Sequence, residues 1–503
     1  MSGNSKNFPI MLGLLSIFAA LFSGLAATTA NPIIIVLIIS AFGGIFLLMQ
    51  PKWTMWIVLT IGLLATGTLP LWIPSLNKLG WGVSMLGLLL FAGATFEQIT
   101  RYQSKLKTPL FIKIALIFFV YSIVISVIQW YSPGELFTAI KRYYQVWGLM
   151  FALTWLAFSL SEIQRIQRLM LWLAFAQLPF ALYELFKFVP MRKALALSIP
   201  GLVPIDIVAG TFGGEMLGGG ENGSMATFLI IMFAFLLSRW RSQLLTTKQF
   251  IWCSIPTLLP LFLGETKIVV IFFPVMFFGI YGKALLRNPM QGLITTIIVI
   301  LITVTAGYMY AEIYINKPFL TVIQDTLSYN FGSRGYGNDY LNRTTAISFW
   351  WAQHITDPAH LIFGHGLGSA HSSAGALKPG HIAQLFTGYG IDLTAASELL
   401  WETGLMGLSL YLSIFLSAWL TASKLLKKST SIEQSADITA IKSTLPIILI
   451  FIFYRNSPLE TLTFQIIFVM QLGYLAYLAR KITYDSQISS IAAQKTKNPN
   501  QNG

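Results

Sequence analysis

Residues 109–130 read PLFIKIALIFFVYSIVISVIQW, and they decide the fold class because Lys113 is the only charged residue among them. A helix needs about 20 apolar residues to cross about 30 Å of hydrocarbon, and this stretch is long enough. Comparable stretches lie near residues 8–28, 32–50, 53–73, 79–97, 143–160, 169–188, 223–238, 250–264, 267–282, 292–312, 395–420, 443–457 and 461–479. The sequence therefore predicts an all-α, polytopic membrane protein with about 14 transmembrane helices.

Composition agrees with a membrane protein. The chain has 503 residues, of which 55% are hydrophobic and 10% charged, whereas soluble domains carry about 25% charged residues. The first apolar run, Pro9–Ala27, follows Lys6 and precedes many more spans, so we interpret it as an anchored helix rather than a cleaved leader. Cys253 is the only cysteine and lies in a predicted helix, which excludes a disulfide framework and a thiolate metal cluster.

The net charge of +14 does not indicate nucleic-acid binding, because the cations are scattered between apolar spans rather than gathered in one patch. We therefore expect no nucleic-acid partner. Starting from a cytoplasmic N-terminus, the alternation of spans places most of the 33 Lys and Arg residues on the cytoplasmic side, as the positive-inside rule requires. This topology also puts the C-terminus in the cytoplasm.

The predicted topology divides the chain into four regions. Residues 1–312 hold eleven helices with a shorter outer loop at 189–222, and residues 395–482 hold the last three helices. Between them lies a large extracytoplasmic loop, residues 313–394, and long ordered loops are usually functional. Residues 483–503, rich in Ser, Gln, Asn and Lys, are expected to form a disordered cytoplasmic tail.

A helix is expected inside the large loop at Asn342–His354. The residues that recur there at helical spacing, and would share one face, are Arg343, Ile347, Trp350, Trp351 and His354. Such a helix is expected to lie on the outer membrane surface with its tryptophans toward the lipid.

All five histidines fall within the large loop, namely His354, His360, His365, His371 and His381. The imidazole pKa suits proton transfer near neutral pH, so the clustering indicates a general base or a metal site. The alternative is that polar loops tolerate histidine where lipid-facing helices do not. We predict a proton-transfer role, with no metal and no cofactor.

A set of cations lies within or beside apolar segments on the predicted outer face: Arg142, Lys187, Lys267, Arg343 and Arg455. Ionisable groups at membrane depth are costly and tend to mark sites, and arginine binds phosphate oxygens through paired hydrogen bonds. Converging cations of this kind would hold a lipid diphosphate headgroup. The alternative is that each side chain only extends to the interface, an interpretation we favour least for Arg343 and Lys267.

Several carboxylates also lie at the predicted outer face: Glu184, Glu265, Glu398, Glu402 and Glu460. Glu398 and Glu402 are four residues apart and share one face of the helix that begins near Ala395. Either could accept a proton, although a structural ion pair is the more frequent reason for an acid at a helix entrance. The glycine runs do not follow a soluble strand, and no Gly-Lys-Ser/Thr motif exists, so nucleotide binding is not indicated.

Three segments follow one another in the C-terminal half: NRTTAISFW at 342–350, LIFGHGLG at 361–368 and ELLWETGLMGL at 398–408. Together they resemble the C-terminal module of the O-antigen ligase and Wzy-type polysaccharide polymerase superfamily. Residues 342–350 resemble its helix with an arginine and a tryptophan. Residues 361–368 resemble its glycine turn, and residues 398–408 resemble its helix ending ExGxxGL. Upstream, GTFGG at 210–214 and ENG at 221–223 resemble the loop before a helix in the same proteins. GETK at 264–267 stands where many members carry Ser-Arg.

The resemblance implies glycosyl transfer at the outer face of the bacterial cytoplasmic membrane. An acceptor hydroxyl would attack the reducing-end sugar of an undecaprenyl diphosphate-linked glycan, and the lipid diphosphate would leave. Arg343 and Lys267 would stabilise the developing charge, with Arg142, Arg455, Glu398 and Glu402 as further substrate-binding candidates. The implied partners are the lipid-linked donor, the glycan acceptor and the bilayer; a chain-length regulator or export proteins are further candidates.

One departure from the family pattern concerns the general base. Many members place a His-Asn pair shortly before the final ExG, whereas Ile391-Asp392-Leu393-Thr394 occupies this region here. His371, His381 and Asp392 therefore all remain candidate bases.

Three functions stay open at this point. The favoured one is a polymerase that extends exopolysaccharide or O-antigen repeat units. The second is a ligase of the same superfamily, which transfers a finished glycan to lipid A core or to a protein. The third is a flippase or another transporter, which many helices would suit but which usually has short loops and charges spread along the helices.

Overall fold

The computed structural model describes residues 43–44, 46–100, 107–199, 202–264, 266–288, 318–332, 335, 339–372 and 378–497, with a few further positions between 290 and 312. Every regular element in these residues is a helix, which confirms the all-α prediction for this part of the chain. The predicted spans 8–28, 32–50 and 292–312 lie wholly or mostly outside the described residues.

Eight helices of the described chain are long and apolar enough to cross a membrane. They are Pro74–Thr100, which includes α5 (Leu79–Thr100); α6 (Leu110–Ile128); Leu160–Ala196, formed by α9 (Leu160–Tyr183), η2 (Glu184–Phe188) and α10 (Val189–Ala196); α11 (Asn222–Arg241); α13 (Val269–Arg287); α19 (Ala395–Lys428); α20 (Ile432–Ile452); and Leu462–Gln487 of α22 (Leu462–Lys497). The chain is thus a helical, multi-pass membrane protein, and the count of fourteen spans stays a prediction.

The remaining described elements are shorter. They are α3 (Pro51–Leu64), α4 (Leu69–Trp72), η1 (Pro74–Lys78), α7 (Pro133–Tyr144), α8 (Trp147–Trp155), η3 (Pro204–Ile207), η4 (Gly210–Phe212), α12 (Thr247–Leu263), α15 (Phe319–Phe331), α16 (Arg343–His354), α17 (Pro358–Phe363), α18 (His381–Leu385) and α21 (Ser457–Glu460). Residues 143–160, predicted as one span, do not form one continuous helix. Val146, with φ −133° and ψ 13°, leaves helical geometry between α7 and α8, and the Gln145 amide donates to the Glu460 carbonyl 2.9 Å away.

Several helices extend beyond their predicted bounds, and α20 and α22 do so most clearly. α20 begins at Ile432 rather than near 443, because Asp437, which interrupts the apolar pattern, is paired inside the protein with Arg239 at 2.8 Å. α22 continues to Lys497, so much of the segment expected as a disordered tail is helical. Residues 474–497 contain neither glycine nor proline, the two residues that most often interrupt a helix.

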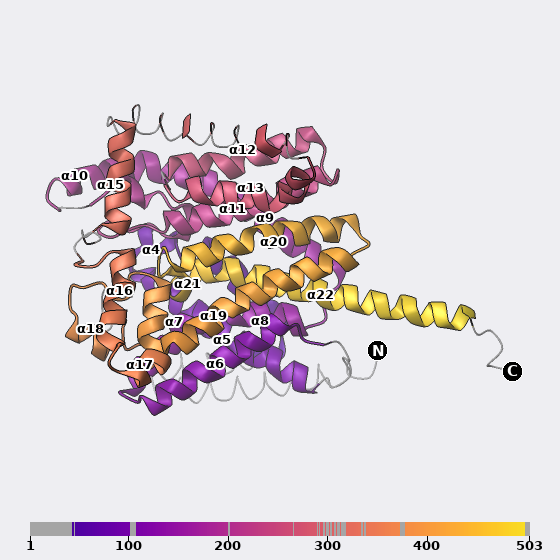
Figure 1. Ribbon diagram of the computed structural model, residues 1–503, viewed down its shortest axis with the longest axis horizontal. Coiled ribbons are helices and arrows are strands. Elements are labelled where there is room, and N and C mark those ends of the chain that lie inside the picture. Colours follow the sequence, from indigo (N-terminus) through magenta and orange to yellow (C-terminus); the bar gives the residue numbers. More distant parts are fainter. Residues whose placement is uncertain are drawn as a thin grey trace, which may run out of the picture.

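The helices pack into a bundle whose two ends differ. α22 packs against α8, α19 against α6, and α11 against α20. In Figure 1 the loop helices α15, α16, α17 and α18 gather at one end of the bundle, and the C-terminal part of α22 projects from the other. The region that resembles the transferase module therefore lies at one end, which we call the loop end.

α19 is bent at Gly404, where φ is 66° and ψ is −170°. A Cβ there would overlap the Ile362 carbonyl and the left-handed geometry would be strained, so this position requires glycine. The nine residues of α19 before the bend, 395–403, pack against α17 and carry Glu398 and Glu402. The bend thus divides α19 into a short N-terminal part, which carries Glu398 and Glu402, and a long apolar remainder.

α16 confirms the helix expected at 342–354, with Asn342 as its N-cap. Its expected orientation, with both tryptophans toward the lipid, is wrong. Trp350 is 2% exposed in an apolar core with Trp401 of α19, whereas Trp351 is 48% exposed. Adjacent residues on a helix point in different directions, so only one of the two can enter this core.

Candidate active site

Arg142, in the last turn of α7, is the centre of a buried group of charges. It is 5% exposed and approaches three carboxylates, with Nη1 3.1 Å from Glu398 Oε1, Nη1 2.5 Å from Glu460 Oε1, and Nη2 3.8 Å from Glu402 Oε1. These carboxylates surround the guanidinium in the described structure, which makes Arg142 a structural cation rather than a ready phosphate ligand.

The two glutamates of α19 differ in how they are satisfied. Glu402 accepts hydrogen bonds from the Tyr143 hydroxyl at 2.7 Å and from the backbone N–H of Ala370 at 3.3 Å. Glu398 is fully buried, and its Oε2 has no hydrogen-bond partner among the described residues. A buried acceptor without a partner is costly, which is typical of a site where a ligand or proton arrives.

His371 lies against two carboxylates. Its Nδ1 is 2.7 Å from Glu460 Oε1 and 3.6 Å from Asp392 Oδ2. Asp392 is held by Ser372, whose backbone N–H and hydroxyl both donate to it at 2.7 Å. We call Arg142, His371, Asp392, Glu398, Glu402 and Glu460 the ionic cluster.

The pKa values of His371 and Glu460 depend more on their charged neighbours than on burial. Burial alone would lower the pKa of His371, but its contacts with Asp392 and Glu460 raise it to about 9. Burial alone would raise the pKa of Glu460, but the charges of Arg142 and His371 lower it to about 2. At neutral pH the pair is therefore an imidazolium and a carboxylate. Since Nδ1 lies against the two carboxylates, proton exchange with a substrate would use the other ring nitrogen, Nε2.

A glycine turn brings His371 to this place. Gly364 has φ 72°, and a Cβ there would overlap the backbone of Glu402 and Thr403 on α19. Beyond it, the backbone N–H groups of His365 and Gly366 donate to the carbonyls of Trp401 and Glu402, both at 2.9 Å. The sequence LIFGHGLG is thus a turn packed directly on α19, not the flexible linker that glycine content alone suggests.

A second group of positive side chains lies nearby. Arg455 is hydrogen-bonded through Nη1 to the Gly220 carbonyl at 3.0 Å and is 3.5 Å from Glu221 Oε1. Burial raises the pKa of Asp206, and the charges of Arg192, Arg455 and Lys267 partly offset this effect. Lys267 itself is exposed. We call Arg192, Lys267 and Arg455 the cation group.

Residues 453–461, which we call the hub segment, connect these groups. The Tyr454 carbonyl accepts from Arg343 Nε at 2.6 Å, and the Tyr454 ring lies 4.2 Å from the Arg343 guanidinium. Ser457 and Thr461 donate to Glu221 at 3.0 and 3.1 Å. Arg455 belongs to the cation group and Glu460 to the ionic cluster. One short segment thus carries a residue of each group, Arg455 and Glu460, within one stretch of chain.

The five histidines do not form one site. His381 pairs through Nδ1 with Glu135 at 2.9 Å and stacks on Tyr131. Glu135 is about two turns of α7, roughly 10 Å, from Arg142. His354 and His365 are joined through their Nε2 atoms at 2.9 Å, and His360 stacks on His365 at 4.1 Å. Burial lowers the pKa of His365 to about 3, so it is neutral at physiological pH. His371 alone enters the ionic cluster.

Of the other acids and cations singled out in the sequence, Glu184 accepts from the backbone N–H groups of Ala209 and Gly210 at 2.9 and 2.7 Å, and so closes a loop. Lys187 contacts the Tyr183 hydroxyl at 2.6 Å. Glu265 lies outside the described residues. Tyr143 and Ser372 were not predicted, because nothing in their local sequence distinguishes them from ordinary polar residues. Glu221 was quoted only as part of the ENG motif, and no role was predicted for its side chain.

The donor set of the ionic cluster also bears on metal binding. Among the described residues, a nitrogen of His371 and carboxylate oxygens of Asp392 and Glu460 lie within 4.8 Å of one another. A metal ion there would require His371 to lose its proton and would compete with Arg142 for Glu460. The expectation of no metal stays a prediction.

Comparison with known proteins does not identify the chain, since no protein-family model matches it and no curated protein is significantly similar to it. The resemblance to the ligase and polymerase superfamily therefore rests on the quoted motifs.

Proposed function

We propose that the protein is a membrane glycosyltransferase that acts on undecaprenyl diphosphate-linked oligosaccharide, and that it joins exopolysaccharide or O-antigen repeat units. The observation that carries this proposal is the hub segment, because it joins a proton-transfer group, His371 with Glu460, to the cation group. Acid–base chemistry next to positive charge is what sugar transfer from a diphosphate leaving group needs.

In the proposed reaction the acceptor hydroxyl oxygen attacks the anomeric carbon of the donor sugar. The neutral form of His371, whose fraction grows as the pH rises toward about 9, takes the hydroxyl proton at Nε2, while Glu460 and Asp392 lie against Nδ1 and stabilise the imidazolium that forms. The bond between the anomeric carbon and the diphosphate oxygen breaks, and the lipid diphosphate leaves with the bonding electron pair. His371 then releases its proton to solvent.

The positive side chains have different roles in this proposal. Arg142 is surrounded by carboxylates and maintains the ionic cluster. Arg343 is a positioning residue that holds Tyr454, and with it the hub segment, through a hydrogen bond and a ring contact. Exposed Lys267 and partly exposed Arg455 are the cations that would meet the diphosphate.

The finer topology is part of the same proposal: fourteen spans, both termini in the cytoplasm, and the large loop outside the bacterial cytoplasmic membrane. The loop end of the bundle would then face the extracytoplasmic side, where lipid-linked repeat units are joined. Cysteine accessibility tests this directly, because a cysteine introduced at Lys378 should react with a membrane-impermeant maleimide added to intact cells whose outer membrane is permeabilised.

The test in cells replaces Arg343 with Ala and, as a control, exposed Lys193 on α10 with Gln. Loss of polymer length and yield in the first strain and normal polymer in the second supports the proposal. Unchanged polymer in both strains contradicts it. Polymerase and ligase are separated by gene deletion: single units that are still attached indicate a polymerase, and free lipid-linked polymer indicates a ligase.

A second candidate, transport of a lipid-linked oligosaccharide, is favoured by one observation. Arg142, Glu398 and Glu402 form a buried ionic group at the head of a membrane helix, and buried charges of this kind often line transport pathways. Proteoliposomes with a labelled lipid-linked repeat separate the two functions. Movement of label between leaflets without new glycosidic bonds supports transport, whereas elongation of the glycan supports the transferase.

A further inference from the structure

A cavity of about 320 Å³ lies at the end of the bundle opposite the loop end, between α9, α11 and α22. α11 begins at Asn222, beside Glu221 and the hub segment, and reaches the cavity mouth at Arg239, about 26 Å further along the helix. The cavity is thus remote from the ionic cluster, and the proposed transferase chemistry does not use it.

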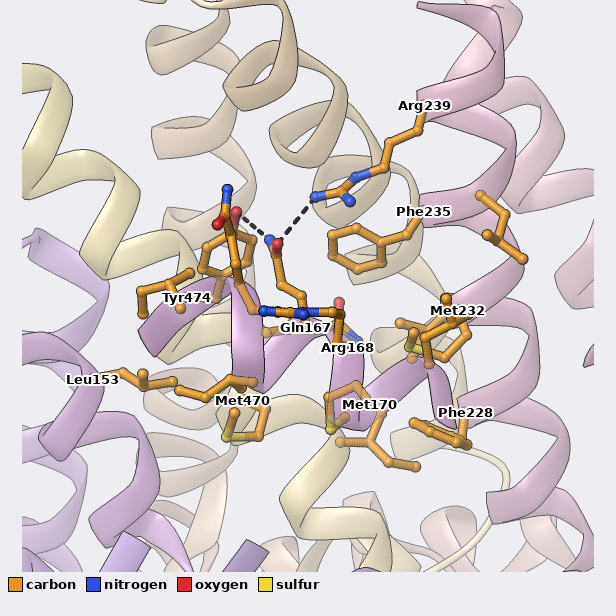
Figure 2. A pocket seen from close by; sticks show the side chains of 18 of the residues that line it. Leu153, Gln167, Arg168, Met170, Phe228, Met232, Phe235, Arg239, Met470 and Tyr474 are labelled. Carbon is orange, nitrogen blue, oxygen red and sulfur yellow. Dashed lines mark hydrogen bonds between the residues drawn. The ribbon is translucent and has the colours of Figure 1, made fainter. Parts of the chain in front are cut away.

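The cavity is apolar along its length and polar at one end (Figure 2). In Figure 2, Met170, Phe228 and Met470 lie at one end of the cavity and Arg239 at the other, with Gln167, Arg168, Met232 and Tyr474 between them. From Phe228 to Arg239 the wall formed by α11 is about 16 Å long, close to half of the about 30 Å hydrocarbon thickness. These dimensions match the chain of a lipid in one leaflet.

The two arginines that line the cavity differ in availability. Arg239 is occupied: Nε and Nη2 donate to Asp437 at 2.8 and 2.9 Å, and Nη2 also donates to Gln167 at 3.1 Å. Arg168 is exposed and, within the described structure, donates only from Nε to the Gln164 carbonyl of its own helix at 3.3 Å. Arg168 therefore has no carboxylate partner among the described residues, whereas Glu433, a carboxylate that also lines the cavity, lies 3.8 Å from Arg239.

A buried polar group just inside the mouth also lacks a partner. Gln471 of α22 lines the cavity, is 5% exposed, and accepts through Oε1 from the Thr444 hydroxyl at 2.9 Å. Its Nε2 has no hydrogen-bond partner among the described residues. Gln471 lies one helical turn from Tyr474, so its unused donors sit between the polar mouth and the apolar depth.

We propose that this cavity binds an anionic phospholipid from the leaflet at the Arg239 end of α11. One acyl chain fills the apolar depth, an ester carbonyl accepts from Gln471 Nε2, and the phosphate meets Arg168. This order of groups, cation then amide donor then apolar wall, follows the order of phosphate, ester and chain in a phospholipid. A free anion would satisfy Arg168 alone and leave the depth of the cavity unfilled.

The test uses the full chain, purified in detergent and exchanged into nanodiscs of phosphatidylcholine. Dioleoyl phosphatidylglycerol is titrated, and retained lipid is counted by native mass spectrometry. Arg168→Gln should weaken its binding about fivefold, the effect of one cation at a membrane surface. The matched control is Arg165→Gln, because Arg165 is also exposed on α9 but does not line the cavity; it should bind as the wild type does.

Two further measurements test whether the bound anion is a lipid rather than a free phosphate compound, and whether Gln471 in the cavity contributes to binding. Glycerol 3-phosphate should not displace the bound lipid, and Gln471→Leu, which removes the unused donors without loss of volume, should weaken binding while Arg168 is intact. Equal binding by phosphatidylcholine and phosphatidylglycerol, equal effects of the two arginine variants, displacement by glycerol 3-phosphate alone, or unchanged binding by Gln471→Leu would each overturn the proposal.

Discussion

Replacing His371 with Gln should remove a pH dependence of stability that the wild-type protein shows between about pH 6 and pH 10. Burial opposes protonation of His371, but Asp392 and Glu460 outweigh burial and raise its pKa from 6.5 to about 9. The folded protein therefore binds this proton more tightly than the unfolded chain does. The resulting stabilisation is fully present below pH 6.5 and is lost as the pH rises through 9. Since a pKa shift of one unit corresponds to about 1.4 kcal/mol, the shift from 6.5 to about 9 contributes about 3 kcal/mol.

The assay follows thermal unfolding of purified protein by tryptophan fluorescence over this pH range. Lys141 acts in the opposite direction, because burial lowers its pKa from 10.5 to about 8, so its contribution to stability rises with pH. Lys141 is present in both proteins, and the difference between wild type and His371→Gln therefore isolates His371. His360→Gln, at a partly exposed histidine outside the ionic cluster, is the control and should behave as wild type. Parallel pH profiles for His371→Gln and wild type would refute the pairing of His371 with Glu460.

Three further predictions concern other parts of the site. Arg142→Met should destabilise the protein by about 3–5 kcal/mol, because it leaves three carboxylates without their shared cation, whereas exposed Lys193→Gln should change stability by less than about 0.5 kcal/mol in the same unfolding assay. Gly404→Ala should prevent accumulation of folded protein, while Gly82→Ala, where a Cβ meets nothing within 4 Å, should give a normal yield of monodisperse protein; equal yields would contradict the role of the bend. In a reconstituted transfer assay the rate should rise with pH toward about 9, and Asp392→Asn should move this rise to lower pH, because the imidazolium loses a negative neighbour; an unmoved profile would exclude His371 as the base.

The membrane helices could be predicted because their signal is local. The stretch 109–130 is apolar almost throughout, and α6 covers most of it. The errors arose where tertiary contacts override that signal. Asp437 suggests a helix end in the sequence, but its pairing with Arg239 lets α20 begin at Ile432.

The site could be predicted only in part, for a similar reason. Three candidate residues were chosen because they are charged and lie within or beside apolar segments, namely Arg142, Glu398 and Glu402. The structure brings them together. The five histidines were grouped because they are close in the sequence, yet turns at glycines such as Gly364 distribute them among three environments. The hub segment could not be foreseen, because its bonds join residues more than a hundred positions apart, such as Arg343 to Tyr454 and Ser457 to Glu221.

The central claim is that the hub segment joins a proton-transfer group to diphosphate-binding cations. Its most direct test incubates purified protein with a synthetic undecaprenyl diphosphate-linked repeat unit and resolves the glycan products by length. Wild-type protein and Lys193→Gln should yield elongated glycan, His371→Gln should yield almost none, and Lys267→Gln with Arg455→Gln should raise the KM for the donor by about tenfold or more. Elongation that is unaffected by all of these changes, or no elongation by folded wild-type protein, would contradict the account.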